Sequence, residues 1–209
     1  MAQADGMLVF LDLAADRYCA LNSSSSARLS PHLARDGEDV DPDMIERLRR
    51  ARLITDDECS RTFAPTIAVP PVREVHRTQS VSIVESANAA FCRLLAERSL
   101  RRRHIAEVVR ARRNWRTGRS GPSAKDAEQA LSQKAAHFLS SRALRGGRDA
   151  CLKEALALLY HLGERGAAAD WVFAVKGAPF AAHCWVQLGD LVLNDSVENV
   201  AAYTPIMVA

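Results

Sequence analysis

A change of hydrophobic period in the C-terminal third of the chain constrains its fold most strongly. Residues 150–164 are predicted to form a helix that is apolar nearly all round over residues 155–159, which is typical of a helix in the middle of a core. After Gly163 and Gly166 the apolar residues alternate with period two, which predicts strands. The expected strands are residues 171–175, 183–188, 191–195 and 206–208. Helices followed by an antiparallel sheet predict an α+β fold.

The composition is that of an ordinary globular protein. The chain has 209 residues, of which 48% are hydrophobic and 25% charged, so one large domain or two small ones would fit. No apolar run approaches the roughly 18 to 20 residues that span a bilayer. No basic region precedes the first apolar stretch, as it would in a secretion signal. We therefore expect a cytoplasmic protein with no membrane segment.

The cysteines fit neither a disulfide framework nor a structural zinc site. Their number is odd, and no two of them form a C-x-x-C pair. The five positions are Cys19, Cys59, Cys92, Cys151 and Cys184. We expect free thiols, each of which is either a packing residue or a chemical group.

Residues 1–62 are predicted to form a small winged-helix-like module. Residues 7–13 and 17–21 alternate as two strands joined by a turn do. A serine run favours a helix over residues 25–35, and Pro42 stands at a suitable first position for a second helix.

A proline-rich segment follows this module. Residues 63–85 contain Pro65, Pro70 and Pro71, which break helix and sheet patterns. We therefore predict a linker here and a second domain over residues 86–209.

Residues 87–115 are compatible with one kinked helix or with two short helices. The basic residues Arg101, Arg102 and Arg103 interrupt the apolar pattern in the middle. One helical face is predicted to carry Phe91, Leu94, Leu95, Ile105, Val108 and Val109.

Charge is distributed in three blocks. The net charge is +3, but residues 1–60 carry −5, residues 61–150 carry +11 and residues 151–209 carry −3. On charge alone the arginine-rich stretch 93–119 would suit nucleic acid. It holds no aromatic residue besides Trp115 and shows no recognition-helix pattern. We therefore favour a solvated helix face, with docking of a partner protein as a third interpretation.

Cys151 lies in the first turn of the predicted core helix. The unpaired amides and the dipole of a helix start stabilise a thiolate, so this position suits a nucleophile. Taken alone, a buried cysteine is more often a packing residue. The catalytic interpretation therefore depends on partners.

His183 and Asp195 are the expected partners, on a hairpin over residues 183–195. With a three-residue loop at 188–190, the two side chains share one sheet face at roughly 5 Å between Cβ atoms. A two-residue loop would pair His183 with Ser196 and point Asp195 away. In that case the hairpin would be a surface feature with an incidental histidine.

The chain order of these residues has a chemical meaning. A helix-start cysteine followed by a strand histidine and a next-strand aspartate is the order of papain-like and transglutaminase-like enzymes, in which the cysteine attacks a carbonyl. Cys184 is a rival thiol next to His183. Because neighbours on a strand point to opposite faces, we predict a packing role for Cys184.

The same residues resemble a known family, the lasso peptide B proteins, which are leader peptidases that process microcin-type precursors. The segment around residues 18–22 is similar to the leader-recognition element fused to one branch of that family. The positions that carry the resemblance are Cys151, Ala155, Leu156, Leu159, Gly163, Pro179, Phe180, His183, Trp185, Val186, Gly189, Asn194 and Asp195. One departure is Cys184, where the family tends to have alanine or serine.

The resemblance implies a cytoplasmic cysteine peptidase with a transglutaminase-like fold that removes the leader of a ribosomally made precursor. Cys151 would be the nucleophile, His183 the general base and then acid, and Asp195 the group that orients the imidazole. A separate ATP-using, asparagine-synthetase-like cyclase would close the freed core peptide. The chain itself would then need no metal, no cofactor and no nucleic acid. The main-chain N–H of Cys151 is a reasonable oxyanion donor because it lies at the helix start.

The N-terminal module would bind the leader as an added strand. By the resemblance, the leader lies between residues 17–21 and residues 42–51. The candidate leader-binding residues are Tyr18, Ala20, Ile45 and Leu48, and Ile45 and Leu48 fit a core role better.

Two other functions stay open from the residues alone. One is a transglutaminase-like acyltransferase, which would share the three catalytic residues. The other is a non-catalytic protein that binds peptide or nucleic acid.

Overall fold

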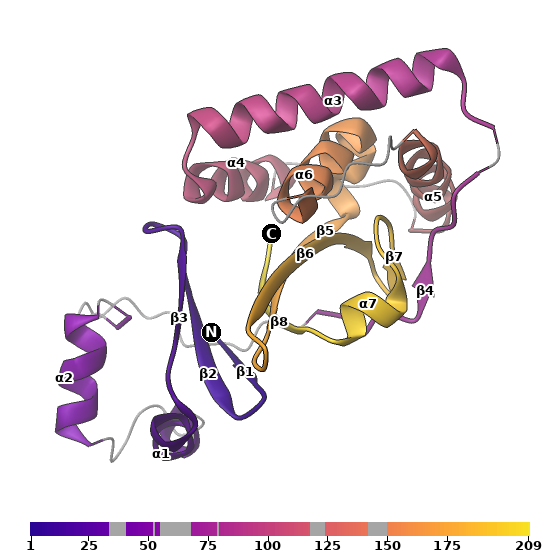
Figure 1. Ribbon diagram of the computed structural model, residues 1–209. Helices are drawn as coiled ribbons and strands as arrows, with labels where there is room; N and C mark the ends of the chain where they lie inside the picture. The colour runs from indigo at the N-terminus through magenta and orange to yellow at the C-terminus, as the bar shows by residue number, and fades with distance from the viewer. Residues whose placement is uncertain (34–40, 52, 55–67, 79, 118–123, 142–149) are drawn as a thin grey trace.

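The computed structural model describes residues 1–209 except 34–40, 52, 55–67, 79, 118–123 and 142–149. In the described residues there are two sheets, one of three strands in the order β1-β2-β3 and one of five in the order β4-β7-β6-β5-β8. Figure 1 shows the small sheet with helices α1 and α2 on one side of the molecule and the larger sheet under helices α3 to α6. The helix and sheet content confirms the expected mixture of α and β structure.

The N-terminal sheet consists of β1 (Ala2–Ala4), β2 (Met7–Asp12) and β3 (Arg17–Ala20), all antiparallel. β2 and β3 confirm the two predicted strands, whereas β1 was not predicted. Asp5 and Gly6 form its two-residue turn and both have positive φ, 46° and 75°. An Asp-Gly pair is the sequence signal of such a hairpin.

Two helices cover one face of this sheet, α1 (Ser23–Leu33) and α2 (Pro42–Arg50). The Asn22 carboxamide caps α1 by accepting from the Ser25 amide at 2.9 Å, and Asp41 caps α2 by accepting from the Asp43 amide at 3.0 Å. The small core beneath them contains Leu8, Phe10, Leu29, Met44 and Leu48. The winged-helix-like character of this module stays a prediction.

The larger sheet contains β5 (Asp170–Lys176), β6 (Ala181–Leu188), β7 (Leu191–Val192), β8 (Thr204–Val208) and β4 (Arg73–Glu74). β4 pairs in parallel with β7, so the predicted purely antiparallel sheet is wrong at this edge. The pairing also places part of the predicted linker 63–85 inside the sheet. Two residues are too short to show a period, which is why sequence patterning did not find β4.

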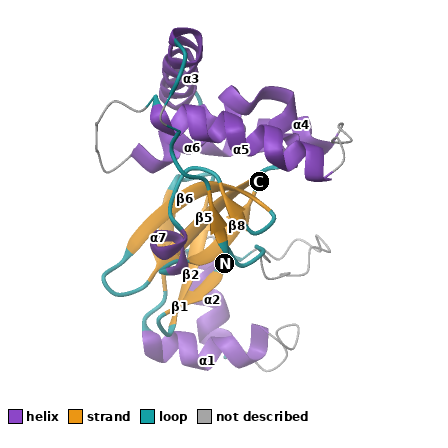
Figure 2. Ribbon diagram, turned by 90° about the vertical axis from the view of Figure 1, so that its right-hand side faces the viewer, coloured by secondary structure: helices purple, strands orange, loops and turns teal. Residues whose placement is uncertain are grey.

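Four helices lie on one face of the larger sheet, α3 (Ile83–Arg102), α4 (Ile105–Thr117), α5 (Ala124–Ser140) and α6 (Ala150–Leu162). Figure 2 shows this helical layer over the strands. A 3₁₀ helix, Gly163–Ala168, connects α6 to β5, and α7 (Val197–Ala201) covers the opposite sheet face. Residues 155–159 of α6 are all buried, as predicted for a core helix.

Helices α3 and α4 are two separate elements, and the face predicted for α3 is wrong. Phe91 and Leu94 are 57% and 62% exposed, and Leu95 is also exposed. The buried residues of α3 are instead Ala89, Cys92 and Ala96. Small side chains let helices approach closely, so the α3 face against the core is its small-residue face.

The two sheets share a hydrophobic core. Ala2, Ala4 and Val9 belong to the same buried cluster as Trp171 of β5. At the edge of this contact the Asp5 carboxylate accepts hydrogen bonds from the amides of Gly177 and Ala178, at 2.9 and 3.1 Å. The N-terminal module is therefore held in a defined position on the C-terminal part of the chain.

Candidate active site

Cys151 lies in the first turn of α6 and is half-buried. It packs against the main hydrophobic core. This position confirms the predicted placement at the start of the core helix, where main-chain amides point toward the side chain.

His183 and Asp195 are in direct contact, with the imidazole Nε2 2.5 Å from Oδ2 of the carboxylate. His183 is carried by β6, and Asp195 lies just before α7. The imidazole is flanked by the rings of Tyr203 and Trp185, at centroid distances of 5.1 and 6.0 Å. These rings keep the pair half-buried, which strengthens its electrostatic interaction.

The loop predicted to align the two residues is wrong. β6 and β7 pair Leu188 with Leu191 and Gln187 with Val192. This is a two-residue loop, and its register would bring Ser196 opposite His183.

His183 and Asp195 are nevertheless in contact, because strand β7 ends early, at Val192. The Leu193 amide still donates to the Val186 carbonyl at 2.9 Å, but the Val186 amide donates to the Asn194 side chain at 2.7 Å. The Asn194 carboxamide thus takes the place of a main-chain acceptor, the chain leaves the ladder after Val192, and Asp195 turns back toward His183.

Asn199 is a functional candidate that sequence reasoning missed. Its carboxamide nitrogen lies 3.0 and 3.1 Å from the two Asp195 oxygens and 3.4 Å from His183 Nε2. Ser196 caps α7 by accepting from the Asn199 amide at 3.2 Å, and the Ser196 amide donates to Asp195 at 2.8 Å. A Ser-x-x-Asn start of a short helix directly after Asp195 was the available signal.

Cys151 reaches His183 at an open edge of β6. β7 pairs with β6 only at Gln187 and Leu188, so no described strand covers that edge of β6 around His183 and Cys184. The Cys151 sulfur there receives hydrogen bonds from the Cys184 side chain, the His183 side chain and the Cys184 main chain. Approach from the edge explains how one sulfur contacts neighbouring residues that point to opposite sheet faces.

These contacts lower the pKa of Cys151 to about 4, first through the Cys184 side chain and then through His183, against the opposing effect of burial. Burial by itself lowers the pKa of His183, but Asp195 and Cys151 outweigh it and raise that pKa to about 9. The pKa of Asp195 is lowered, because hydrogen bonds from His183, Ser196 and Asn199 outweigh its burial. At neutral pH the site is a thiolate beside an imidazolium and a carboxylate.

Cys184 has more than the predicted packing role. It is buried in the main core, and its thiol is hydrogen-bonded to Cys151. This bond, burial and the Cys151 charge raise the pKa of Cys184 well above its usual value. Cys184 therefore stays a neutral donor, and Cys151 carries the negative charge.

The structure separates the four predicted leader-binding residues into two groups. Leu48 is buried in the small core and Ile45 is half-buried on α2. Ala20 is exposed on β3, and Tyr18 packs toward the main core. β3 is the last strand of its sheet.

Several arginines of the basic stretch bind other parts of the protein, so a solvated face is an incomplete description. Arg93 forms an ion pair with Glu154 at 3.1 Å and lies over the Phe138 ring. The buried Arg112 donates to the carbonyls of Gly166 and Ala169, both at 2.6 Å.

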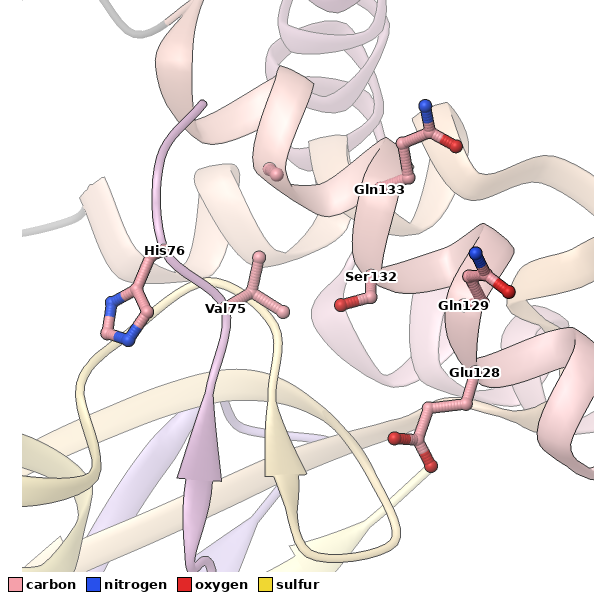
Figure 3. A pocket seen from close by; sticks show the side chains of 7 residues that line it. Val75, His76, Glu128, Gln129, Ser132 and Gln133 are labelled. Carbon is pink, nitrogen blue, oxygen red and sulfur yellow. The ribbon is translucent and has the colours of Figure 1, made fainter. Parts of the chain in front are cut away.

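A pocket of about 680 Å³ lies between α5 and the segment after β4. Figure 3 shows its polar lining, which includes His76, Glu128, Gln129 and Gln133. Its lining residues do not include Cys151 or His183, so it is not the site of their chemistry.

Two further features concern the described residues. None of their helices is long and apolar enough to cross a membrane. They contain no group of three or more His, Cys, Asp or Glu side chains suited to hold a metal ion.

A cysteine at the start of a helix, beside a strand histidine that contacts a carboxylate, is the arrangement of cysteine peptidases and acyltransferases. The family model of the transglutaminase-like superfamily matches residues 89–208, which is more than half of the chain. The protein belongs to the transglutaminase-like superfamily. No curated protein and no solved structure matches the chain.

Proposed function

We propose that this protein is a cysteine peptidase that binds the leader of a ribosomally made lasso peptide precursor and cleaves it off. The observation that carries the proposal is a thiolate-forming Cys151 beside His183, in a domain onto which a small sheet with an edge strand is docked. The first part suits acyl chemistry on a peptide, and the second suits peptide binding by strand addition.

Cys151 acts as the nucleophile. Its sulfur attacks the carbonyl carbon of the scissile bond, and His183 then gives its proton to the departing amine. The core peptide leaves with a free N-terminus, and the leader stays bound to sulfur as a thioester. Water, deprotonated by His183, hydrolyses the thioester and restores the thiolate.

Asp195 acts through His183 by holding the ring orientation and stabilising the imidazolium. Because Nε2 faces the carboxylate, Nδ1 is left for proton exchange at the sulfur. Asn199 in turn holds the carboxylate. The main-chain N–H groups of Cys151 and Cys184 are the candidate donors to the oxyanion, since the Cys184 main chain already bonds to the sulfur.

The edge of β3 would receive the leader as a further strand, next to α2. Ala20 is exposed on this strand, so its surroundings are accessible to a peptide. The buried Leu48 would support the groove without touching the leader. A partner cyclase would then use the freed amine.

The test uses the full chain and a short precursor peptide, to be sought in the reading frames that neighbour its gene. We expect mass spectrometry to show two fragments whose masses sum to that of the precursor plus one water. Cys151→Ala should abolish cleavage and leave leader binding intact, with Phe91→Ala as the control on a distant exposed ring. A product in which the leader acyl group is joined to an amine would instead show a transferase, and cleavage by Cys151→Ala would overturn the proposal.

A further inference from the structure

Tyr18 is the residue of β3 whose ring packs against the main core of the C-terminal domain. It pairs with Leu11 across β2 and β3, and both side chains pack against the main core. Cys19, the next residue on β3, packs instead with the small core beneath α1 and α2. Tyr18 therefore faces the C-terminal domain, on the opposite side of the sheet from the two helices.

The Tyr18 ring meets a ring of the C-terminal domain. Its partner is Phe180, in an edge-to-face contact with the centroids 5.8 Å apart. Phe180 belongs to the turn between β5 and β6, directly before the strand that carries His183. Phe180 is 47% exposed, so much of this aromatic pair is open to a ligand.

Tyr18 is also close to the reacting sulfur. Burial, followed by electrostatic interactions with the Cys184 and Cys151 side chains, raises the pKa of Tyr18 to about 12. Cys151 packs against the same hydrophobic cluster as Tyr18. The Gly177 amide donates a hydrogen bond to the Asp5 carboxylate, and this bond holds the N-terminal sheet against the turn that contains Phe180.

We propose that Tyr18 and Phe180 form a subsite that holds a substrate side chain on the acyl side of the scissile bond and prefers an apolar side chain to a charged one. The inference rests on the proposed peptidase function. The leader precedes the bond that is cut, so a leader bound along β3 must pass these rings to bring its end to Cys151. Aromatic faces attract apolar groups but do not compensate a charge for lost water.

The experiment uses peptidyl chloromethyl ketones, which alkylate a reactive thiolate with loss of chloride and form a thioether. Each reagent carries glycine next to the ketone and either leucine or glutamate before that glycine. Iodoacetamide has no side chain and reports the reactivity of Cys151 alone. Peptide mapping by mass spectrometry confirms that Cys151 is the residue modified.

We expect the leucine reagent to inactivate the protein about 10-fold or more faster than the glutamate reagent, as an apolar pocket discriminates. Phe180→Ala and Tyr18→Ala should remove most of that ratio without changing the iodoacetamide rate. Tyr18→Phe should keep the ratio because the ring is retained. Phe91→Ala, which removes an exposed ring on α3, is the matched control.

An unchanged ratio in Phe180→Ala, with a normal iodoacetamide rate, would overturn the subsite. A Tyr18→Ala variant that also loses iodoacetamide reactivity would show a structural role for Tyr18, contrary to the proposal. The proposed peptidase function fails in a different way, if neither peptidyl reagent modifies Cys151 of the unaltered protein faster than it modifies a free thiol in solution.

Discussion

The imidazole of His183 contacts the carboxylate of Asp195 at 2.5 Å, although the register of the hairpin would bring Ser196 opposite His183. The contact depends on Asn194, whose side chain replaces a main-chain acceptor at Val186. A regular strand through Asp195 would point its carboxylate to the wrong face. The short β7 is therefore a requirement of the site.

Asn194→Ala tests this dependence directly. The Val186 amide would lose its acceptor, so the ladder can extend and turn Asp195 away. We expect kcat/KM to fall about 100-fold or more, since His183 loses its orienting group, while the free energy of unfolding falls by only about 1 kcal/mol. Asn194→Asp keeps an acceptor oxygen and should retain more activity. Equal losses in both variants would contradict this explanation.

Cys184→Ala is expected to raise the pKa of Cys151. The Cys184 thiol is the largest cause that lowers this pKa, so its removal makes the thiolate less stable. The rate of alkylation by iodoacetamide, followed against pH, should titrate at higher pH than in the unaltered protein. Cys184→Ser, which keeps a donor, is the control and should shift the curve less. The prediction fails if Cys184→Ala leaves the titration where it was.

Activity should show a broad plateau in pH. The pKa of Cys151 is lowered to about 4 and that of His183 is raised to about 9. The reactive ion pair therefore forms as the pH rises through about 4, when the thiol loses its proton, and disappears as the pH rises through about 9, when the imidazolium loses its own. Steady-state kcat/KM measured from pH 3 to pH 10 would check this. In Asp195→Asn the alkaline limb should move to lower pH, because the carboxylate that favours the imidazolium is gone.

Gly177→Ala should weaken the attachment of the N-terminal module. A Cβ at this position would lie 2.8 Å from the Asp5 Cβ and 2.9 Å from the Ala4 carbonyl oxygen. Relief of this overlap requires backbone movement, so we expect a loss of about 1 to 3 kcal/mol in the free energy of unfolding. Chemical denaturation measures it. Gly189→Ala is the comparison. A Cβ there would have no neighbour within 4 Å, but the φ of +56° is unfavourable for alanine, so this variant shows the effect of backbone strain without an overlap of atoms.

Arg93→Met should destabilise the helical layer. Arg93 joins α3 to Glu154 of α6 and to the Phe138 carbonyl of α5, at 3.1 Å in both cases. The substitution leaves the half-buried Glu154 without its partner, which we expect to cost about 2 kcal/mol or more. Arg101→Met, at an exposed ion pair within α3, should cost less than about 1 kcal/mol. Similar losses for the two variants would contradict a structural role for Arg93.

Long segments with a regular hydrophobic period were predictable, because the spacing of apolar residues along the chain indicates which side chains are buried. The core helix α6, the strands β2, β3, β5 and β6 and the position of Cys151 all follow from local patterns. The exposed Phe91 and Leu94 show the limit of this argument. An apolar side chain indicates burial only if another element covers its face, and α3 turns its alanine face to the core.

Residue type, together with a helix start followed by strands, was enough to select Cys151, His183 and Asp195 as the residues chemically able to form the candidate site. How these residues meet depends on the tertiary structure. Asn194 ends a strand against its own register, and the open edge of β6 lets Cys151 contact His183 and Cys184 together. The tertiary structure also packs Tyr18 against the C-terminal domain, where its ring meets Phe180. Each of these depends on contacts between segments far apart in the chain, which no local pattern of residues encodes.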